Sequence, residues 1–390
     1  MRLVLALTAM LAAAAPVRAI DQSHAERGRE MAARAADYLR SVQDESGGWA
    51  IRARGPQLPA ISALVLKGLL LEPGVDSSDA VVARGADWML SFRTPEGGIH
   101  DGMLPSYNTS VCLSTLAMLD TDGARAAIEP AQRLLRGLQY SEAATLDERV
   151  GNTTARVPVG HAFYGGVGYG THSRPDLSNL QLMLQGLHDS GVSPEDPAFK
   201  RALVFLERTQ MLDAVNDMPY ADGSSQGGFI YSTSPDAAHV GRGESKAGMI
   251  EETLDDGVSV SRLRAYGSIT YAGFKSYIYA DLPRDDPRVE AALGWIERHY
   301  TLDENPGLGD AGLYYYFVTF ATALDAWDEA WIETAGERRD WANDLIDRLG
   351  ELQDEDGSFR PVNDRWMEGD RTLVTAYALI ALHYALDRAP

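Results

Sequence analysis

Six times along this chain, an amphipathic segment leads through a Gly-rich turn into a segment that is apolar on nearly every side. The amphipathic segments place apolar residues at helical spacing, as Tyr38, Leu39 and Val42 do in the first copy. A helix with one polar face should meet solvent, whereas a helix that is apolar all round should be buried. The six exposed-then-buried pairs cover residues 32–70, 81–119, 131–187, 199–280, 289–327 and 341–384.

This repetition predicts an all-α fold. We expect an α/α toroid of six helix pairs, in which the buried helices form an inner barrel and the exposed helices surround it. Helical pairs that recur at such a long period are typical of stacked repeats rather than of a simple bundle. No segment shows the alternation that is typical of a strand. An open solenoid of the same pairs is the structural alternative.

Two of the turns share a spaced set of residues. Residues 43–49 carry the pattern Gln-x-x-x-Gly-x-Trp, and residues 353–359 carry Gln-x-x-x-Gly-x-Phe. A Gln amide can bond the free backbone groups at a helix end, while the aromatic ring packs on the next helix. In these turns the chain resembles the squalene-cyclase and protein-prenyltransferase superfamily. The resemblance implies an α/α toroid over essentially the whole mature chain, but it implies little about activity.

The diagnostic catalytic motifs of that superfamily are missing. Its class II terpene cyclases use an Asp-x-Asp-Asp motif at the head of an inner helix, where clustered carboxyls keep one group protonated. Here Asp120 and Asp122 follow a buried segment instead of preceding it, and Asp255 and Asp256 lie in a long loop. Prenyltransferases bind zinc through Asp, Cys and His, but Cys112 has no Asp two residues before it. We therefore expect no metal and no other cofactor.

The first nineteen residues resemble a secretory signal. Arg2 precedes an apolar stretch over residues 3–15, and small residues lead to a cleavage site at Ala19. This predicts a periplasmic or secreted protein with one toroid domain over residues 20–390. The apolar stretch is too short to span a bilayer securely, so we expect no stable membrane insertion, with a retained N-terminal anchor as the alternative.

Charge and cysteine content narrow the partners further. The net charge of −21 argues against nucleic acid as a partner, because phosphate binding needs a basic surface. Cys112 is the only cysteine, so the chain forms no internal disulfide, and its place in an apolar segment predicts a buried side chain. A small molecule or a glycan in the central cavity remains as the expected partner.

The segments that enter the buried helices are where site residues are expected. In an all-parallel inner barrel, six helix N-termini would open on one mouth, and their N–H groups favour anionic or polar ligand groups. The candidate ligand-binding residues near this mouth are Tyr169, Arg174, Asn179, Lys246, Tyr266, Tyr315, Trp366 and Asp370. The candidate catalytic residues are Asp176 and Glu244.

Several of these candidates also have structural interpretations. Asp176 could belong to a capping box with Ser173, with Pro175 in the first helical turn. Glu244 and Lys246 lie in the long irregular stretch 231–266, which could close over the mouth as a lid or remain a solvated loop. Asp370 is placed to cap the last helix.

Two function classes follow from this pattern. In one, the cavity is an enzyme site, either terpenoid-cyclase-like or, in the manner of a lyase, acting on a polysaccharide. In the other, the protein holds a lipid, terpenoid or glycan without turnover. A terpenoid- or lipid-like ligand is favoured by the resemblance, and a purely structural role ranks third. Paired carboxyls in the lumen would favour catalysis, and an aromatic lumen without such pairs would favour binding.

Overall fold

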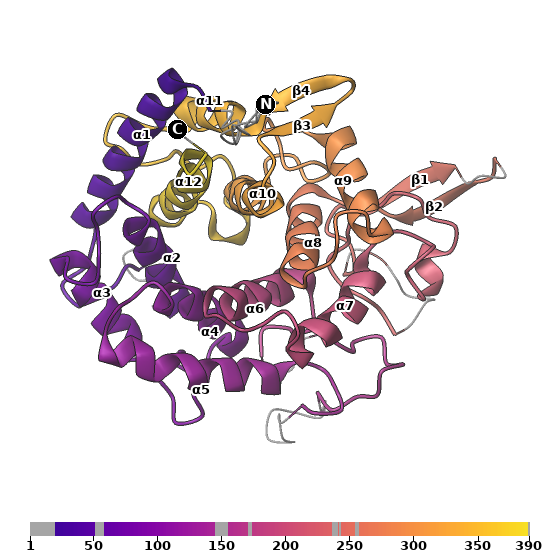
Figure 1. The fold of residues 1–390 in the computed structure, drawn as a ribbon, viewed down its shortest axis with the longest axis horizontal. Coiled ribbons are helices and arrows are strands. Elements are labelled where there is room, and N and C mark those ends of the chain that lie inside the picture. Colours follow the sequence, from indigo (N-terminus) through magenta and orange to yellow (C-terminus); the bar gives the residue numbers. More distant parts are fainter. Residues whose placement is uncertain are drawn as a thin grey trace, which may run out of the picture.

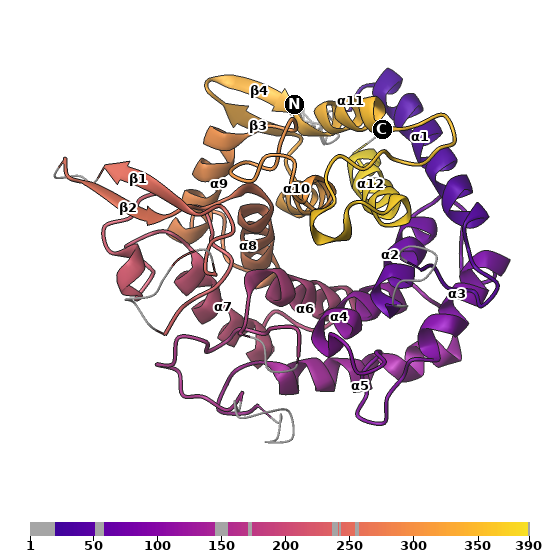
Figure 2. The ribbon, with the colours of Figure 1, turned by 180° about the vertical axis from the view of Figure 1, so that it is seen from behind.

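The chain forms a closed double ring of helices (Figures 1 and 2). The computed structural model describes residues 20–50, 58–144, 155–170, 174–235, 241, 243–253 and 257–388. The inner ring consists of α2 (Pro59–Leu70), α4 (Pro105–Leu116), α6 (Leu177–Asp189), α8 (Gly267–Tyr279), α10 (Leu313–Trp327) and α12 (Arg371–Leu386). The outer ring consists of α1 (Gln22–Ser41), α3 (Ala80–Leu90), α5 (Asp122–Leu138), α7 (Pro197–Thr209), α9 (Pro287–His299) and α11 (Trp341–Leu352).

The two ends of the chain meet and close both rings. Helix α12 packs against α2 in the inner ring, and α11 packs against α1 in the outer ring. The predicted α/α toroid is therefore confirmed, and the open solenoid is excluded. The predicted signal sequence at residues 1–19 lies outside the described residues. Among the helices that are described, none is long and apolar enough to cross a membrane.

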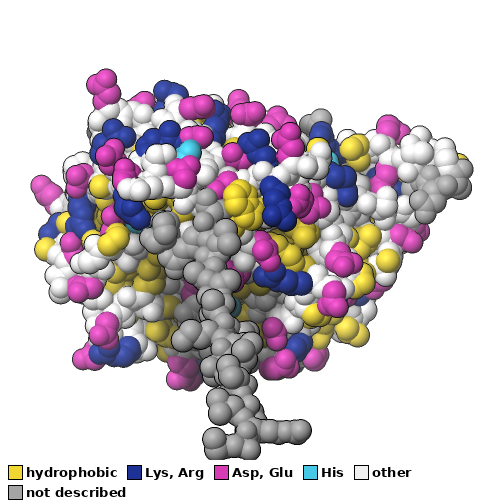
Figure 3. Space-filling model, turned by 45° about the horizontal axis from the view of Figure 1, so that its top comes forward, with side chains coloured by type: hydrophobic (Ala, Val, Ile, Leu, Met, Phe, Trp, Pro, Cys, Tyr) yellow, Lys and Arg dark blue, Asp and Glu magenta, His cyan; other side chains and the backbone are white. Residues whose placement is uncertain are grey.

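Outer and inner helices differ in burial as their patterns predict. Nearly every residue of α2 and α8 is buried, whereas each outer helix keeps one exposed face. On the face shown in Figure 3, acidic and basic side chains are interspersed over the surface. Cys112 is completely buried in α4, as expected for a small apolar side chain.

Two short hairpins differ from the expectation that no segment forms strands. They lie at the periphery of the ring (Figure 1), and most of their side chains are not buried, so no alternation of apolar residues marks them. The second hairpin turns at Ala335 and Gly336, which both have positive φ, as tight hairpin turns require. The hairpins are β1 (Met249–Thr253) with β2 (Ser259–Leu263) and β3 (Trp331–Thr334) with β4 (Glu337–Asp340).

Four glutamines tie each of their turns to the next outer helix. Each follows an outer helix and donates both amide hydrogens, one to a carbonyl of its own turn and one to a carbonyl of the neighbouring outer helix, over 2.8–3.1 Å. The last of them reaches the carbonyl of Met31 in α1 and so joins the end of the ring to its beginning. The helix tethering expected at residues 43–49 and 353–359 is thus present, and it recurs in two other turns. The four are Gln43, Gln139, Gln210 and Gln353.

The aromatic residue of each pattern connects the turn to the inner ring. The backbone N–H of Trp49 donates to Ser62 in α2 at 2.9 Å, and that of Phe359 donates to Thr375 in α12 at 2.9 Å. Both rings are almost fully buried. A single turn therefore fixes an outer helix, its inner partner and the next outer helix together.

We expect Gly357→Ala to lower the free energy of unfolding by about 2–4 kcal/mol. Gly357 has a φ of +86°, and an added Cβ would lie 2.3 Å from the carbonyl oxygen of Arg34 in α1, at the ring closure. The control is Gly336→Ala, because Gly336 has the same φ of +86° and no atom within 4 Å of the added Cβ. The control should cost only the left-handed backbone penalty of about 1–2 kcal/mol. Equal losses in urea denaturation would contradict this account of the ring closure.

Candidate ligand-binding site

A cavity of about 390 Å³ lies inside the inner ring. Its wall is built from residues three and four positions apart, such as Tyr107, Ser110, Val111 and Ser114 of α4. This spacing places them on one face of the helix. The cavity runs along the helices from their N-terminal to their C-terminal ends, since α6 contributes Ser178 from its first turn and Gln185 from its last part.

The middle of this cavity is lined by most of its aliphatic side chains, together with the polar residues Ser110, Gln181 and Thr319, and its two ends are polar. We call the end at the N-termini of the inner helices the mouth and the opposite end the floor. The aliphatic residues that line the cavity are Leu64, Leu104, Val111, Leu182, Ile269, Val318 and Ile380.

Tyrosines dominate the mouth. The hydroxyl of Tyr315 contacts Ser178 at 3.0 Å and accepts a hydrogen bond from Gln181 at 3.1 Å. The ammonium of Lys246 lies 4.4 Å from the centre of the Tyr231 ring, a cation–π contact. The other mouth residues that line the cavity include Tyr107, Tyr169, Tyr266, Trp366, Met367, Glu368 and Tyr377.

The backbone at the rim of the mouth is strained. Trp366 and Met367 have consecutive positive φ values of 56° and 69°, a region that residues with a side chain rarely adopt. Both side chains are partly exposed, at 44% and 39%, and both line the cavity. Such strain gathers at ligand sites, so the rim is a candidate point of ligand entry.

Half of the sequence-predicted site residues line the cavity and half do not. Those that line it are Tyr169, Lys246, Tyr266, Tyr315 and Trp366. Those that lie outside the lining are Arg174, Asp176, Asn179, Glu244 and Asp370. Contact of any of them with a ligand stays a prediction.

Asp176 is buried behind the mouth and caps α6. Its carboxylate accepts hydrogen bonds from the backbone N–H of Asn179 at 2.9 Å and from the Asn179 side chain at 2.8 Å. The prediction that Pro175 lies in the first helical turn is wrong, because the helix begins at Leu177 and Asp176 itself is the N-cap. Ser173 lies outside the described residues. Burial raises the pKa of Asp176 to about 6, although hydrogen bonds with Asn179 and Tyr231 lower it.

We expect Asp176→Ala to lower the free energy of unfolding by about 0.5–2 kcal/mol, and Asp176→Asn to lower it less, because Asn also caps helices.

The raised pKa of Asp176 means that the folded state binds more protons than the unfolded state between pH 3.8 and about 6. The stability from this group is therefore present at low pH and lost as the pH rises through about 6. Thermal melts over this pH range should show that Asp176→Asn removes this pH dependence. If the substitution leaves the dependence of the melting temperature on pH unchanged, Asp176 is not its source.

Glu244 and Asp370 have structural partners of their own. The Glu244 carboxylate pairs with the Arg174 guanidinium and accepts the backbone N–H of Gly241 at 2.7 Å. The Glu244 carbonyl accepts the N–H of Tyr231 at 2.7 Å, so this residue holds the loop that carries a mouth tyrosine. Asp370 accepts the N–H of Leu373 at 3.1 Å, which confirms its predicted role as the cap of α12.

Glu368 also lines the cavity, although it is not among the predicted site residues. Its carboxylate accepts the backbone N–H groups of Tyr314 at 3.1 Å and Tyr315 at 2.7 Å. It thereby caps α10, whose own N-cap, Gly312, has no side chain to do so. Burial raises the pKa of Glu368 to about 7, against the effect of these backbone hydrogen bonds. Glu368 lies in the charge-rich turn before α12, but the helix that it caps begins more than fifty residues earlier in the sequence.

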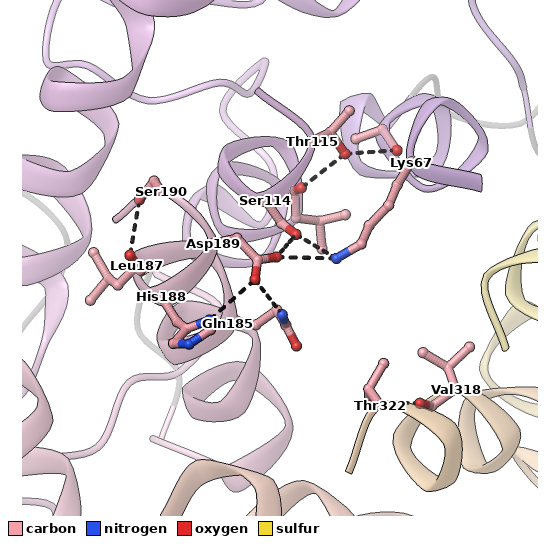
Figure 4. A network of polar contacts seen from close by, with 12 residues as sticks. Lys67, Ser114, Thr115, Gln185, Leu187, His188, Asp189, Ser190, Val318 and Thr322 are labelled. Atoms are coloured by element: carbon pink, nitrogen blue, oxygen red, sulfur yellow. Dashed lines mark hydrogen bonds and ion pairs between the residues drawn. The ribbon is translucent and has the colours of Figure 1, made fainter. Parts of the chain in front are cut away.

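An ion pair lies at the floor (Figure 4). Lys67 of α2 donates to Ser114 of α4 at 2.7 Å and to the Asp189 carboxylate of α6 at 3.1 Å. Ser114 also donates to Asp189, and Gln185 donates to its other oxygen at 2.7 Å. This network joins three inner helices.

A second lysine, Lys275 of α8, lines the floor without a carboxylate partner in the described part of the chain. Its ammonium donates to the side-chain oxygens of Gln185 at 2.6 Å and Thr322 at 3.3 Å, and both of these partners are neutral. Burial lowers the pKa of Lys275 to about 7, the positive charge of Lys67 lowers it further, and Asp189 raises it.

Neither lysine is among the site residues predicted from the sequence, because those residues lie in or near the turns at the mouth. A signal was present: Lys67 and Lys275 are single charges inside otherwise apolar segments, at residues 61–70 and 269–280. Lysines are almost never fully buried unless they are paired. A lysine inside a segment that is predicted to be buried therefore indicates either an ion pair or a functional site, and this reasoning would have added Lys67 and Lys275 to the candidate site residues.

No protein-family model matches this chain, and no curated protein sequence matches it either. Among solved structures it is similar to the α-1,6-mannanase GH76A of Salegentibacter sp. HEL1_6 in complex with α-1,6-mannotriose, with 8% identity and a TM-score of 0.57 over 92% of this chain and 99% of that chain. It is also similar to a type II terpene cyclase from Scytonema in complex with geranylgeranyl dihydroxybenzoate, with 13% identity and a TM-score of 0.51 over 94% and 99%. A third is a glycosidase in complex with glucose, with 12% identity and a TM-score of 0.51 over 95% and 100%. At these identities the similarity establishes the α/α toroid fold and leaves the activity open.

Proposed function

We propose that the protein binds an elongated, mainly apolar ligand of terpenoid or lipid type in the central cavity. The observation that carries this proposal is the aliphatic middle of the cavity wall, which lies between a tyrosine-lined mouth and a polar floor. Ligand cavities are mostly apolar with a few polar groups that fix orientation, and tyrosines present both a stacking face and a polar tip. The terpene cyclase with the same fold is complexed with a prenylated aromatic compound, which is this class of chemistry.

The carboxyl groups of the cavity favour binding over glycoside hydrolysis. Hydrolysis of a glycosidic bond needs two carboxyl groups on either side of that bond. Among the described residues that line the cavity, Glu368 is the only one with a carboxyl group, and both its oxygens accept N–H groups of α10. Cyclase-like acid catalysis by Asp176 would have to act through another residue, because Asp176 does not line the cavity.

The test is to block the cavity. We expect Val111→Trp to weaken the binding of an apolar fluorescent fatty acid at least tenfold, because Val111 lines the aliphatic middle and the indole would occupy it. The matched control is Val159→Trp, which adds the same ring at a residue that is 60% exposed, and it should bind as the wild type does. Mass spectrometry of ligand extracted from the native protein gives an independent readout. Binding of mannotriose without binding of any apolar probe would support the glycan alternative instead.

We also propose that the protein is exported from the cytoplasm and that its first nineteen residues are cleaved off. It is supported by the charged, apolar and small-residue sequence of residues 1–19. N-terminal sequencing of the protein from its native host should give a chain that begins next to Ala19. A chain that is found in the cytoplasm and begins at Met1 would refute export, and it would leave the proposed ligand binding untouched.

A further inference from the structure

The ammonium group of Lys275, at the floor of the cavity, can donate one more hydrogen bond than it forms with the described residues. The residue is 3% exposed, and it lines the cavity. An ammonium group has three hydrogens to donate. Two of them are directed to Gln185 and Thr322, and no described carboxylate lies within ion-pairing distance. No described hydrogen-bond acceptor takes the third, and the centre of the Tyr279 ring lies 5.7 Å from the ammonium.

The floor carries one positive charge more than it carries negative charges when Lys275 is protonated. Asp189 is the carboxylate of the network, and it is paired with Lys67 at 3.1 Å. A buried charge without a counter-charge is costly, whereas a paired one is tolerated. The network would therefore be electrically neutral with one additional negative charge next to Lys275.

Two other acidic residues lie near the C-terminal ends of inner helices, and neither is among the charges that act on Lys275. Glu72 lies 3.1 Å from His383, and Asp325 lies 3.1 Å from Arg388. Neither forms a hydrogen bond or an ion pair with Lys275. The missing charge therefore has no source among the described residues around the floor.

We propose that Lys275 binds the single carboxylate of an otherwise apolar ligand, which lies with its acid group at the floor and its hydrocarbon part along the aliphatic middle of the cavity. This inference rests on the proposed function and adds the head group and the orientation of the ligand. A monoanion fits better than a phosphate, because a dianion would leave the floor with an excess negative charge. The amide nitrogen of Gln185 donates one hydrogen to Asp189 at 2.7 Å, and its second hydrogen can be donated to the other carboxylate oxygen of the ligand.

The test compares dodecanoic acid with dodecanol in isothermal titration calorimetry at pH 6, on the full chain. The two probes share a hydrocarbon tail and differ in the charged head group. The wild type should bind the acid at least tenfold more tightly than the alcohol. Lys275→Met should remove that preference and bind the alcohol as the wild type does. Lys200→Met removes an exposed lysine that pairs with Glu195, and it should keep the preference.

The outcomes separate this inference from the function on which it rests. If the wild type binds both probes and Lys275→Met keeps the preference for the acid, the assignment of Lys275 is overturned while apolar binding stands. If the wild type binds neither probe, the proposed function fails and this inference fails with it. If Lys275→Met binds neither probe, Lys275→Gln serves the same comparison, and a retained acid preference in that variant overturns the assignment.

Discussion

Replacing Lys275 with methionine should stabilise the ligand-free protein at pH 6 by about 1–4 kcal/mol, the gain seen when buried ion pairs are replaced by apolar side chains of similar volume. The side chain is fully buried, and burial together with the charge of Lys67 lowers its pKa from 10.5 to about 7. Keeping the ammonium charged in the folded state therefore costs free energy that methionine does not. The measurement is urea denaturation of both proteins at several pH values.

The gain should shrink as the pH rises. Between about pH 7 and pH 10.5 the unfolded chain binds a proton at Lys275 that the folded chain does not, so wild-type stability rises with pH in this window. The charged groups that face Lys275 are Lys67, which disfavours the ammonium, and Asp189, which favours it. Tyr279 also faces it, and burial raises the pKa of Tyr279 well above 10, so this residue stays neutral over the window. A variant that is less stable than the wild type at every pH would refute this prediction.

Asp189→Asn should have the opposite sign and lower the free energy of unfolding by about 2–4 kcal/mol at pH 7. Removing one partner of a buried ion pair typically costs 3–5 kcal/mol, because the other charge remains buried and unpaired. We expect a smaller loss than this typical range because the Asp189 side chain is 20% exposed. The remaining ammonium of Lys67 would keep only neutral partners at the floor.

The pairing can be isolated by a double-mutant cycle. Lys67→Met with Asp189→Asn should be more stable than Asp189→Asn alone, since it removes the unpaired charge. Burial raises the pKa of Asp189, but Lys67 and the hydrogen bonds from His188 and Ser114 lower it more, so the net shift is downward. The stability from this pair is therefore present above pH 3.8 and lost as the pH falls below it. Additive effects in the cycle would show that the two residues are not coupled.

The mouth and the floor of the cavity differ in how far the sequence revealed them. The mouth could be anticipated, because the N-termini of parallel inner helices must share one end of the ring, and the turns before them are rich in tyrosine and charge. The direction of each side chain could not be anticipated. Tyr169 and Tyr315 face the cavity, whereas Asp176 turns back to bond Asn179 and cap its own helix. Both arrangements satisfy the same local pattern.

By itself, the sequence determined the helix pairs, their exposed and buried faces, and the tethers that close the ring. These follow from local rules, namely helical periodicity, capping, and the fixed spacing of Gln, Gly and an aromatic residue within one turn. Only the tertiary structure decided which groups meet. Lys67, Asp189 and Lys275 come from three inner helices separated by about a hundred residues each, and Glu368 caps a helix that starts more than fifty residues before it. The physical reason is that the charge balance of a buried site depends on distances between helices, which the rotation of each helix in the ring sets and no local pattern encodes.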